Sequence, residues 1–142
     1  MFFNRKNNNI DLPLIKIASL LIHVAKIDED YSKDEEEIIK KTLKSLGAKS
    51  SKINEIMKVA IKNEENSNQI LEFTKEVKSL PENDKVEILE ALWTIVYSNN
   101  EADIYETNLM RRLAGLLYID SKIMGNIKEK IKKRKSLDDL HS

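Results

Sequence analysis

The sequence contains no cysteine, and its 142 residues include only three glycines and two prolines. The absence of cysteine excludes a disulfide framework, a thiolate zinc site and a cysteine nucleophile. So few glycines and prolines disfavour a turn-rich β-sandwich and a glycine-rich phosphate loop, because both need tight backbone turns. No apolar run reaches the roughly 18 residues of a membrane-spanning helix. The first residues lack the pattern of a signal peptide, and we expect a cytoplasmic protein.

An excess of charge of one sign is also missing, since 24 Lys and Arg residues balance 24 Asp and Glu residues. This neutrality excludes a generally basic nucleic-acid coat. The charge is nevertheless segregated, because residues 28–37 hold seven carboxylates and one lysine, whereas residues 128–135 hold six cations and one glutamate. The basic run could touch a phosphate or lipid surface. The helix dipole alone also favours cations near the C-terminal end of a helix.

Apolar periodicity predicts an all-α fold, a single compact domain of about seven helices. The first predicted helix is apolar on nearly every face, which indicates a central, buried position. Gly47 stands where a left-handed residue commonly ends a helix. We expect Ser51 and Ser67 to cap the third and fourth helices, and the polar stretch 62–68 to form a loop. The predicted helices cover residues 12–27, 34–46, 53–61, 70–77, 81–98, 103–117 and 121–131.

The length and the apolar content, 41% of the residues, fit one domain with one packed core. We expect residues 1–10 to be a disordered lead-in and residues 11–134 to form the helical domain. Residues 135–142 are polar and are predicted to be a C-terminal tail.

An internal two-fold helix-loop-helix repeat organises the predicted domain. Residues 17–46 match residues 88–117 at an offset of about 71 residues. In each segment an apolar helix ends in a short acidic loop, and the next helix begins with a carboxylate. Four oxygen-bearing positions recur with the spacing i, i+2, i+4 and i+7: Asp28, Asp30, Ser32 and Glu35 in the first segment, and Asn99, Glu101, Asp103 and Glu106 in the second.

Two interpretations of these oxygen-bearing corners stay open. Oxygens at i, i+2 and i+4 of a loop can converge on a hard cation such as Ca²⁺ or Mg²⁺. An EF-hand is excluded, because its glycine position is occupied by Lys33 and its bidentate glutamate position by Ile39. Alternatively, Ser32 and Glu35 form a capping box that satisfies free N–H groups at a helix start. Asp103 and Glu106 would do the same, which leaves the other four positions as solvated loop residues.

The second segment resembles a known family more closely than the first. Its residues include Leu92-Trp93, Tyr97-Ser98-Asn99-Asn100-Glu101-Ala102-Asp103, Tyr105-Glu106 and Leu109-Met110-Arg111-Arg112-Leu113. This run is similar to the Trp, Ala-Asp-Gly-Glu, Tyr-Glu and Arg-Arg pattern of the TerB-like family, named for tellurite resistance protein TerB. The resemblance covers residues 12–131.

The resemblance implies an all-helical, non-enzymatic protein associated with tellurite and stress resistance, with an acidic face that binds metal ions. It places a weakly bound divalent cation, Ca²⁺ or Mg²⁺, at the two corners. This chain departs from the family pattern, because Glu29 and Asn100 replace the family's glycines and Asn99 lacks a charge. The candidate metal ligands are Asp28, Asp30, Glu35, Asn99, Glu101, Asp103 and Glu106.

Other classes of function are weighed against this binding module. The acidic face could meet a protein partner without any metal, as in an adaptor. A metal-dependent hydrolase would use paired carboxylates, but the sequence contains no Glu-x-x-His or His-Glu-x-x-His motif. A DNA reader is disfavoured by the neutral charge and the acidic corners, so we expect no nucleic-acid partner.

A few single residues also invite interpretation. His23 lies in the most apolar helix, where a satisfied or partly exposed histidine is expected rather than a general base. Trp93 and Tyr97 lie one helical turn apart and are predicted to be core residues, with the indole N–H or the phenol hydroxyl hydrogen-bonded at the edge. Arg111 is predicted to reach back to Thr107 or Asn108, or to pair with a carboxylate of a neighbouring loop.

Overall fold

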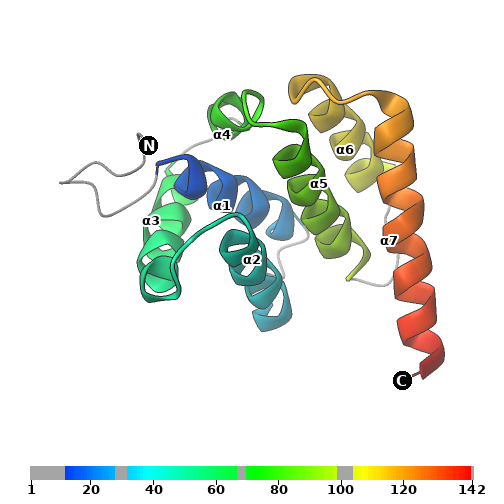
Figure 1. Ribbon diagram of the computed structural model, residues 1–142, viewed down its shortest axis with the longest axis horizontal. Helices are drawn as coiled ribbons and strands as arrows, with labels where there is room; N and C mark the ends of the chain where they lie inside the picture. The colour runs from blue at the N-terminus through cyan, green and yellow to red at the C-terminus, as the bar shows by residue number, and fades with distance from the viewer. Residues whose placement is uncertain (1–11, 28–31, 67–69, 99–103, 142) are drawn as a thin grey trace.

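In the computed structural model, the described residues are 12–27, 32–66, 70–98 and 104–141. They form seven α-helices, one 3₁₀ turn and no strand, which confirms the predicted all-α fold (Figure 1). In chain order these elements are α1 (Leu12–Ala25), α2 (Lys33–Ser45), η2 (Ser50–Lys52), α3 (Ile53–Glu65), α4 (Leu71–Val77), α5 (Glu82–Tyr97), α6 (Ile104–Leu116) and α7 (Ser121–His141).

Helix α1 is surrounded by other helices, as its sequence predicts. Ten of its 14 residues are buried. It packs against α2, α3, α4 and α5 (Figure 1). Burial of a single Leu or Ile side chain contributes about 1.5–3 kcal/mol. The apolar residues on every face of α1 therefore hold four neighbouring helices in place.

Helix α5 joins the two sides of the molecule. It packs against α1 and α2 on one side and against α7 on the other (Figure 1). Its buried side chains include Ile88, Leu92 and Trp93. Helix α6 contacts α4 and α7. Within the described part of the chain, no helix combines the length and the apolarity needed to cross a membrane.

Two predicted boundaries around α3 are wrong. Helix α3 continues to Glu65, so residues 62–65 of the predicted 62–68 loop are helical. Lys and Glu are good helix formers, and Glu64 is buried against α1, so the last turn has a tertiary contact that periodicity does not reveal. Ser51 does not cap α3, because a 3₁₀ turn precedes the helix and Lys52 takes the cap position without a side-chain bond. The predicted cap Ser67 lies outside the described residues.

Helix α7 is longer than its apolar periodicity indicates. It runs to His141, through most of the stretch 135–142 that was predicted to be a polar tail. Lys, Arg and Leu have high helix propensity, so the helix can continue after its apolar stripe ends. Helices α1 and α2, and helices α5 and α6, occupy the two segments of the predicted repeat. Their internal two-fold symmetry and the domain limits at residues 11 and 134 stay predictions.

Helices α2 and α6 end in the same way with different residues. Gly47 follows α2 with a φ of 113°, and the N–H of Ala48 bonds to the carbonyl of Leu43 at 2.9 Å. This is the Schellman arrangement that the position of Gly47 predicts. Tyr118 takes the equivalent place after α6 with a φ of 60°, a left-handed conformation that is costly for a side chain with a Cβ.

Two glycine-to-alanine substitutions should therefore change stability in opposite directions. Gly47→Ala should lower the free energy of unfolding by about 1 kcal/mol, because alanine avoids a positive φ. Gly125→Ala should raise it by about 0.5–1 kcal/mol, because this glycine lies within α7 and an added Cβ meets no atom within 4 Å. Urea denaturation of both variants measures the difference, and changes of the same sign would contradict the assignment of Gly47.

Candidate functional site

The first acidic corner contains the predicted capping box at the start of α2. The N–H of Glu35 donates to Ser32 Oγ at 3.2 Å, and the N–H of Ser32 donates to Glu35 Oε1 at 2.9 Å. The hydroxyl of Ser32 also lies 3.3 Å from Oε1. Glu35 is 1% exposed, which is unusual for a carboxylate and requires that its oxygens have partners. The capping interpretation of Ser32 and Glu35 is confirmed.

The same carboxylate also contacts the second corner. Ser98, which follows α5, has its Oγ 3.3 Å from Oε2 of Glu35. The hydroxyl of Ser98 lies 2.6 Å from the carbonyl of Ile95 as well, so two acceptors compete for its one proton. Whichever acceptor the proton favours, the end of α5 lies beside the start of α2. The sequence pattern does not reveal the role of Ser98, because no local pattern links residues 63 positions apart.

Most of the predicted metal ligands cannot be placed. Asp28, Asp30, Asn99, Glu101 and Asp103 lie outside the described residues, and Glu106 lies in α6 with a side chain that is not described. Glu35 is the one candidate ligand whose side-chain contacts are known. In the described part of the chain, no three His, Cys, Asp or Glu side chains gather closely enough to hold a metal ion. The predicted metal set therefore stays a prediction.

His23 has the satisfied environment that was predicted for it. Its Nδ1 lies 3.1 Å from Glu64 Oε2, and Lys26 donates to the other oxygen of Glu64 at 2.7 Å. The side chain of Glu64 is only 10% exposed, so these two partners offset the cost of burying its charge. The cluster ties the last turn of α3 to the end of α1. Glu64 was missed because it falls in the stretch that was predicted to be a loop.

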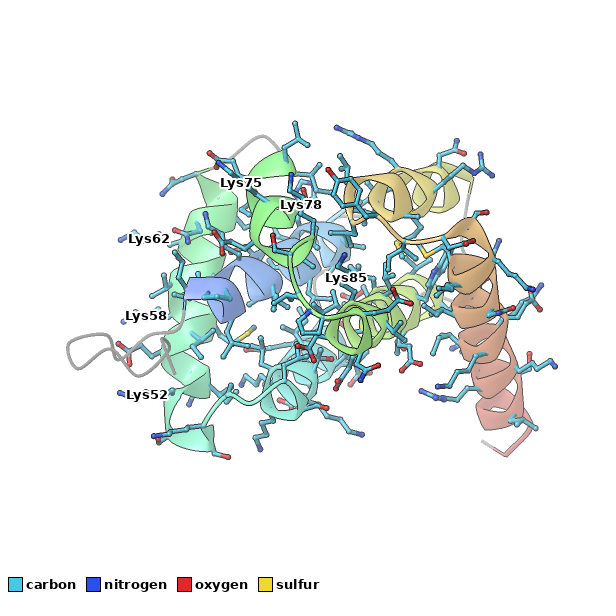
Figure 2. All side chains as sticks on the ribbon, turned by 45° about the horizontal axis from the view of Figure 1, so that its top comes forward. Lys52, Lys58, Lys62, Lys75, Lys78 and Lys85 are labelled. Carbon is cyan, nitrogen blue, oxygen red and sulfur yellow. The ribbon has the colours of Figure 1, made fainter. Side chains whose placement is uncertain are left out.

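The lysine side chains fall into two groups, one that points outward and one buried lysine that the predictions from sequence did not distinguish from the rest. Lys52, Lys58 and Lys62 point away from α1 along the outer side of the α3 region (Figure 2). Lys85 is instead buried, and its Nζ donates to the carbonyl of Leu117 at 2.9 Å, which ties α5 to the end of α6. Lys85 lies three residues before Ile88, on the apolar stripe of α5, and that position is the signal that could have identified it.

Trp93 and Tyr97 are core residues, as predicted. The hydrogen bond suggested for the indole N–H at the edge of the core is not found among the described residues. Their rings stack with centroids 5.7 Å apart. Trp93 is 2% exposed, and among the described residues its buried Nε1 has no hydrogen-bond partner. Lys128 Nζ lies 5.5 Å from the centroid of the Trp93 ring, a cation–π contact between α7 and α5.

Arg111 reaches back to Asn108, one of the two partners predicted for it, with an Nη1–Oδ1 distance of 3.4 Å. The loop carboxylates that could also pair with it lie outside the described residues. Lys130 of the basic helix bonds to Glu90 of α5 at 2.7 Å. Part of the basic run therefore serves to dock α7 against α5.

The buried capping box predicts a graded loss of stability. Glu35→Ala should lower the free energy of unfolding by about 2 kcal/mol, because it removes the cap and leaves the Ser32 N–H without its acceptor. Ser32→Ala should cost about 1 kcal/mol. Asp34→Ala is the matched control, since Asp34 is an exposed carboxylate of the same turn, and it should change stability by less than about 0.5 kcal/mol. Equal losses for Glu35→Ala and Asp34→Ala in urea denaturation would contradict the buried role of Glu35.

The environment of Tyr97 predicts a specific pH dependence. Burial, and secondarily the carboxylate of Glu129, raise the pKa of Tyr97 above its ordinary value of 10.0. The folded chain thus favours the neutral phenol. Its contribution to stability is complete below the unfolded pKa, about 10, and is lost as the pH rises through the higher folded pKa.

Glu129→Gln should lower the pKa of Tyr97 toward 10.0 without reaching it, because burial, the larger cause, remains. Carbon NMR of labelled tyrosine rings across alkaline pH measures this value. Glu87→Gln makes the same charge change elsewhere and should leave the Tyr97 titration in place. A Tyr97 pKa that does not fall in the Glu129 variant would contradict the assigned cause.

Comparison with known proteins identifies the family. A family model described as tellurite resistance protein TerB matches residues 14–129, which is most of the chain. No curated protein and no solved structure gives a significant match. The matched residues extend from α1 into α7 and include both acidic corners. The chain belongs to the TerB family, an all-helical family associated by name with tellurite resistance.

Proposed function

We propose that this TerB domain is a non-enzymatic binding module that holds a divalent cation between its two acidic corners. The observation that supports this proposal is the position of the Glu35 carboxylate. One of its oxygens bonds to Ser32 in the first corner, and the other lies 3.3 Å from Ser98 in the second. Ser32 and Ser98, from which the two loops extend, therefore lie beside the same carboxylate although they are far apart in the sequence.

The chain length between these points and the candidate ligands supports a shared site. Ser32 directly follows residues 28–31, and Ser98 directly precedes residues 99–103. An extended chain spans at most about 3.5 Å per residue. Asp30 and Glu101 therefore each lie within about 11 Å of chain from a residue that contacts Glu35. Side chains from both loops can reach one ion.

The negative charge of the two loops favours the binding of a cation. Residues 28–31 and 99–103 together carry five carboxylates and no cation. Like charges brought to one ion-sized site would repel one another, and a bound cation would remove that repulsion. Ca²⁺ uses six to eight oxygen ligands at about 2.3–2.6 Å, and Asp, Asn and Glu side chains supply them.

The role of Glu35 differs from that of the loop residues. Its oxygens already accept hydrogen bonds from the capping box, and the side chain is almost completely buried. We therefore assign Glu35 a positioning role at the base of the proposed site. The loop carboxylates are the residues that bind the ion. The replacement of both family glycines by Glu29 and Asn100 restricts the loop backbones, so the proposed affinity is weak, on the order of millimolar.

A calcium or magnesium titration tests the proposal directly. The ¹H–¹⁵N resonances of Ile27, of residues 32–35 and of Ser98 should shift together with a single millimolar dissociation constant, because one ion contacts both corners. Asp30→Asn and Glu101→Gln should each weaken binding by about tenfold, since each removes a charged ligand.

Asp34→Asn provides the matched control, because it removes an exposed carboxylate next to Glu35 that is not a proposed ligand. Its dissociation constant should stay within about twofold of the unchanged protein. The cation proposal fails if no amide of either corner responds at millimolar metal, and an adaptor that binds a protein through the acidic face then becomes the better explanation. Metal-dependent turnover of a phosphate ester that disappears in Asp30→Asn would instead support a hydrolase.

A further inference from the structure

A second candidate site lies between α5, α6 and α7, in a cavity of about 370 Å³. This volume is within the range of roughly 300–1,000 Å³ that small-molecule sites occupy. Most of its wall is apolar, with contributions from Trp93, Ala114, Ile119 and Met124. The sequence predicts Trp93 as a core residue and gives no sign of this cavity. The helices that carry them lie together on one side of the molecule (Figure 1).

Two of the residues that line the cavity are glycines. Gly115 of α6 and Gly125 of α7 both line it, and a Cβ added to either would meet no atom within 4 Å. Neither glycine has a positive φ, so neither is required by backbone conformation. Glycine inside a helix is destabilising relative to alanine. The chain thus has a destabilising helical glycine at two positions that line the same cavity.

Two cations lie at the same cavity without a carboxylate partner among the described residues. Lys128 has its Nζ 5.5 Å from the centroid of the Trp93 ring, and Arg111 has a 3.4 Å contact with the amide of Asn108. Lys130, two residues further along α7, instead bonds to Glu90 at 2.7 Å. A negatively charged group at the cavity would therefore meet two positive side chains, Lys128 from α7 and Arg111 from α6.

The indole of Trp93 adds an unused donor. Its Nε1 is buried and has no acceptor within the described parts of the chain. A buried N–H without an acceptor is destabilising, because it has lost its hydrogen bond to water. This N–H therefore has no competing hydrogen bond among the described residues, and its resonance reports on changes beside the Trp93 ring.

We propose that this cavity binds a small organic anion, a molecule with an apolar body and one carboxylate. The apolar body lies against the rings and methyl groups of Trp93, Ile119 and Met124, in the space left by Gly115 and Gly125. The carboxylate faces Lys128 and Arg111. The site does not involve the acidic corners and is independent of the cation proposed there.

Octanoate is a suitable probe, with octanol and octylammonium as neutral and cationic molecules of the same chain length. Trp93 is the one tryptophan of the sequence, so the protein has a single indole N–H resonance that reports on this cavity. Octanoate should shift that resonance saturably at millimolar concentration or below. Octanol should bind more weakly by about threefold to tenfold, and octylammonium should not bind, because two cations face the ligand.

Substitutions locate the site and separate its two parts. Gly125→Leu should abolish the octanoate shift by filling the cavity, whereas Asn126→Leu adds the same group at a neighbouring exposed position and should have no effect. Lys128→Gln should weaken octanoate binding by about threefold to tenfold and leave octanol binding unchanged. Lys132→Gln removes an exposed cation of the same helix outside this cavity and should leave both unchanged.

Each of three results would overturn the proposal. The first is an indole resonance that does not move with octanoate. The second is equal affinity for octanoate and octanol, which would remove the role of the cations. The third is octanoate binding that survives Gly125→Leu in a variant whose circular dichroism shows an intact helical fold. Loss of metal binding at the acidic corners would have no bearing on any of these results.

Discussion

The burial of α1 on all of its faces is the constraint on which the other features depend. A helix with ten buried residues out of 14 cannot lie at a surface, so α2, α3, α4 and α5 must enclose it. This enclosure brings α2 and α5 into contact with each other. Because α2 begins and α5 ends at the acidic corners, the packing of an apolar helix determines where the most polar loops of the chain start. The positions of Ser32 and Ser98, where the two corners begin, are thus a consequence of the apolar core.

The sequence was sufficient to predict those features that depend on interactions between neighbouring residues in the chain. The spacing of apolar residues predicted all seven helices, Ser32 and Glu35 predicted the capping box, and the position of Gly47 predicted the end of α2. It was insufficient where one polar side chain reaches another element. Glu64 lies in a polar stretch whose helical state depends on contacts with α1, 38 and 41 residues away in the sequence. No local pattern records such a contact, so the predicted loop was wrong.

The candidate site divides along the same line. Its capping residues could be predicted, because a capping box is a motif of four consecutive positions. The contact between Glu35 and Ser98 could not, because it depends on how α2 packs against α5. The loop carboxylates could be named from the repeat but not placed. A buried carboxylate shared by two corners favours a positioning role for Glu35, and this distinction between the base of a site and its ligands is absent from the sequence pattern.

The charged residues that sum to a net charge of zero have different structural roles. Glu64 with His23 and Lys26, and Glu90 with Lys130, are pairs that join helices. Lys85 is bound to a backbone carbonyl and joins α5 to the end of α6. Other charges lie at particular places, among them the carboxylates of the two acidic corners and the two cations that line the cavity beside α7. Opposite charges confined to separate places attract opposite ligands. A chain with no net charge can therefore carry a cation site and an anion site, and the two proposals are testable independently because the proposed sites share no residue.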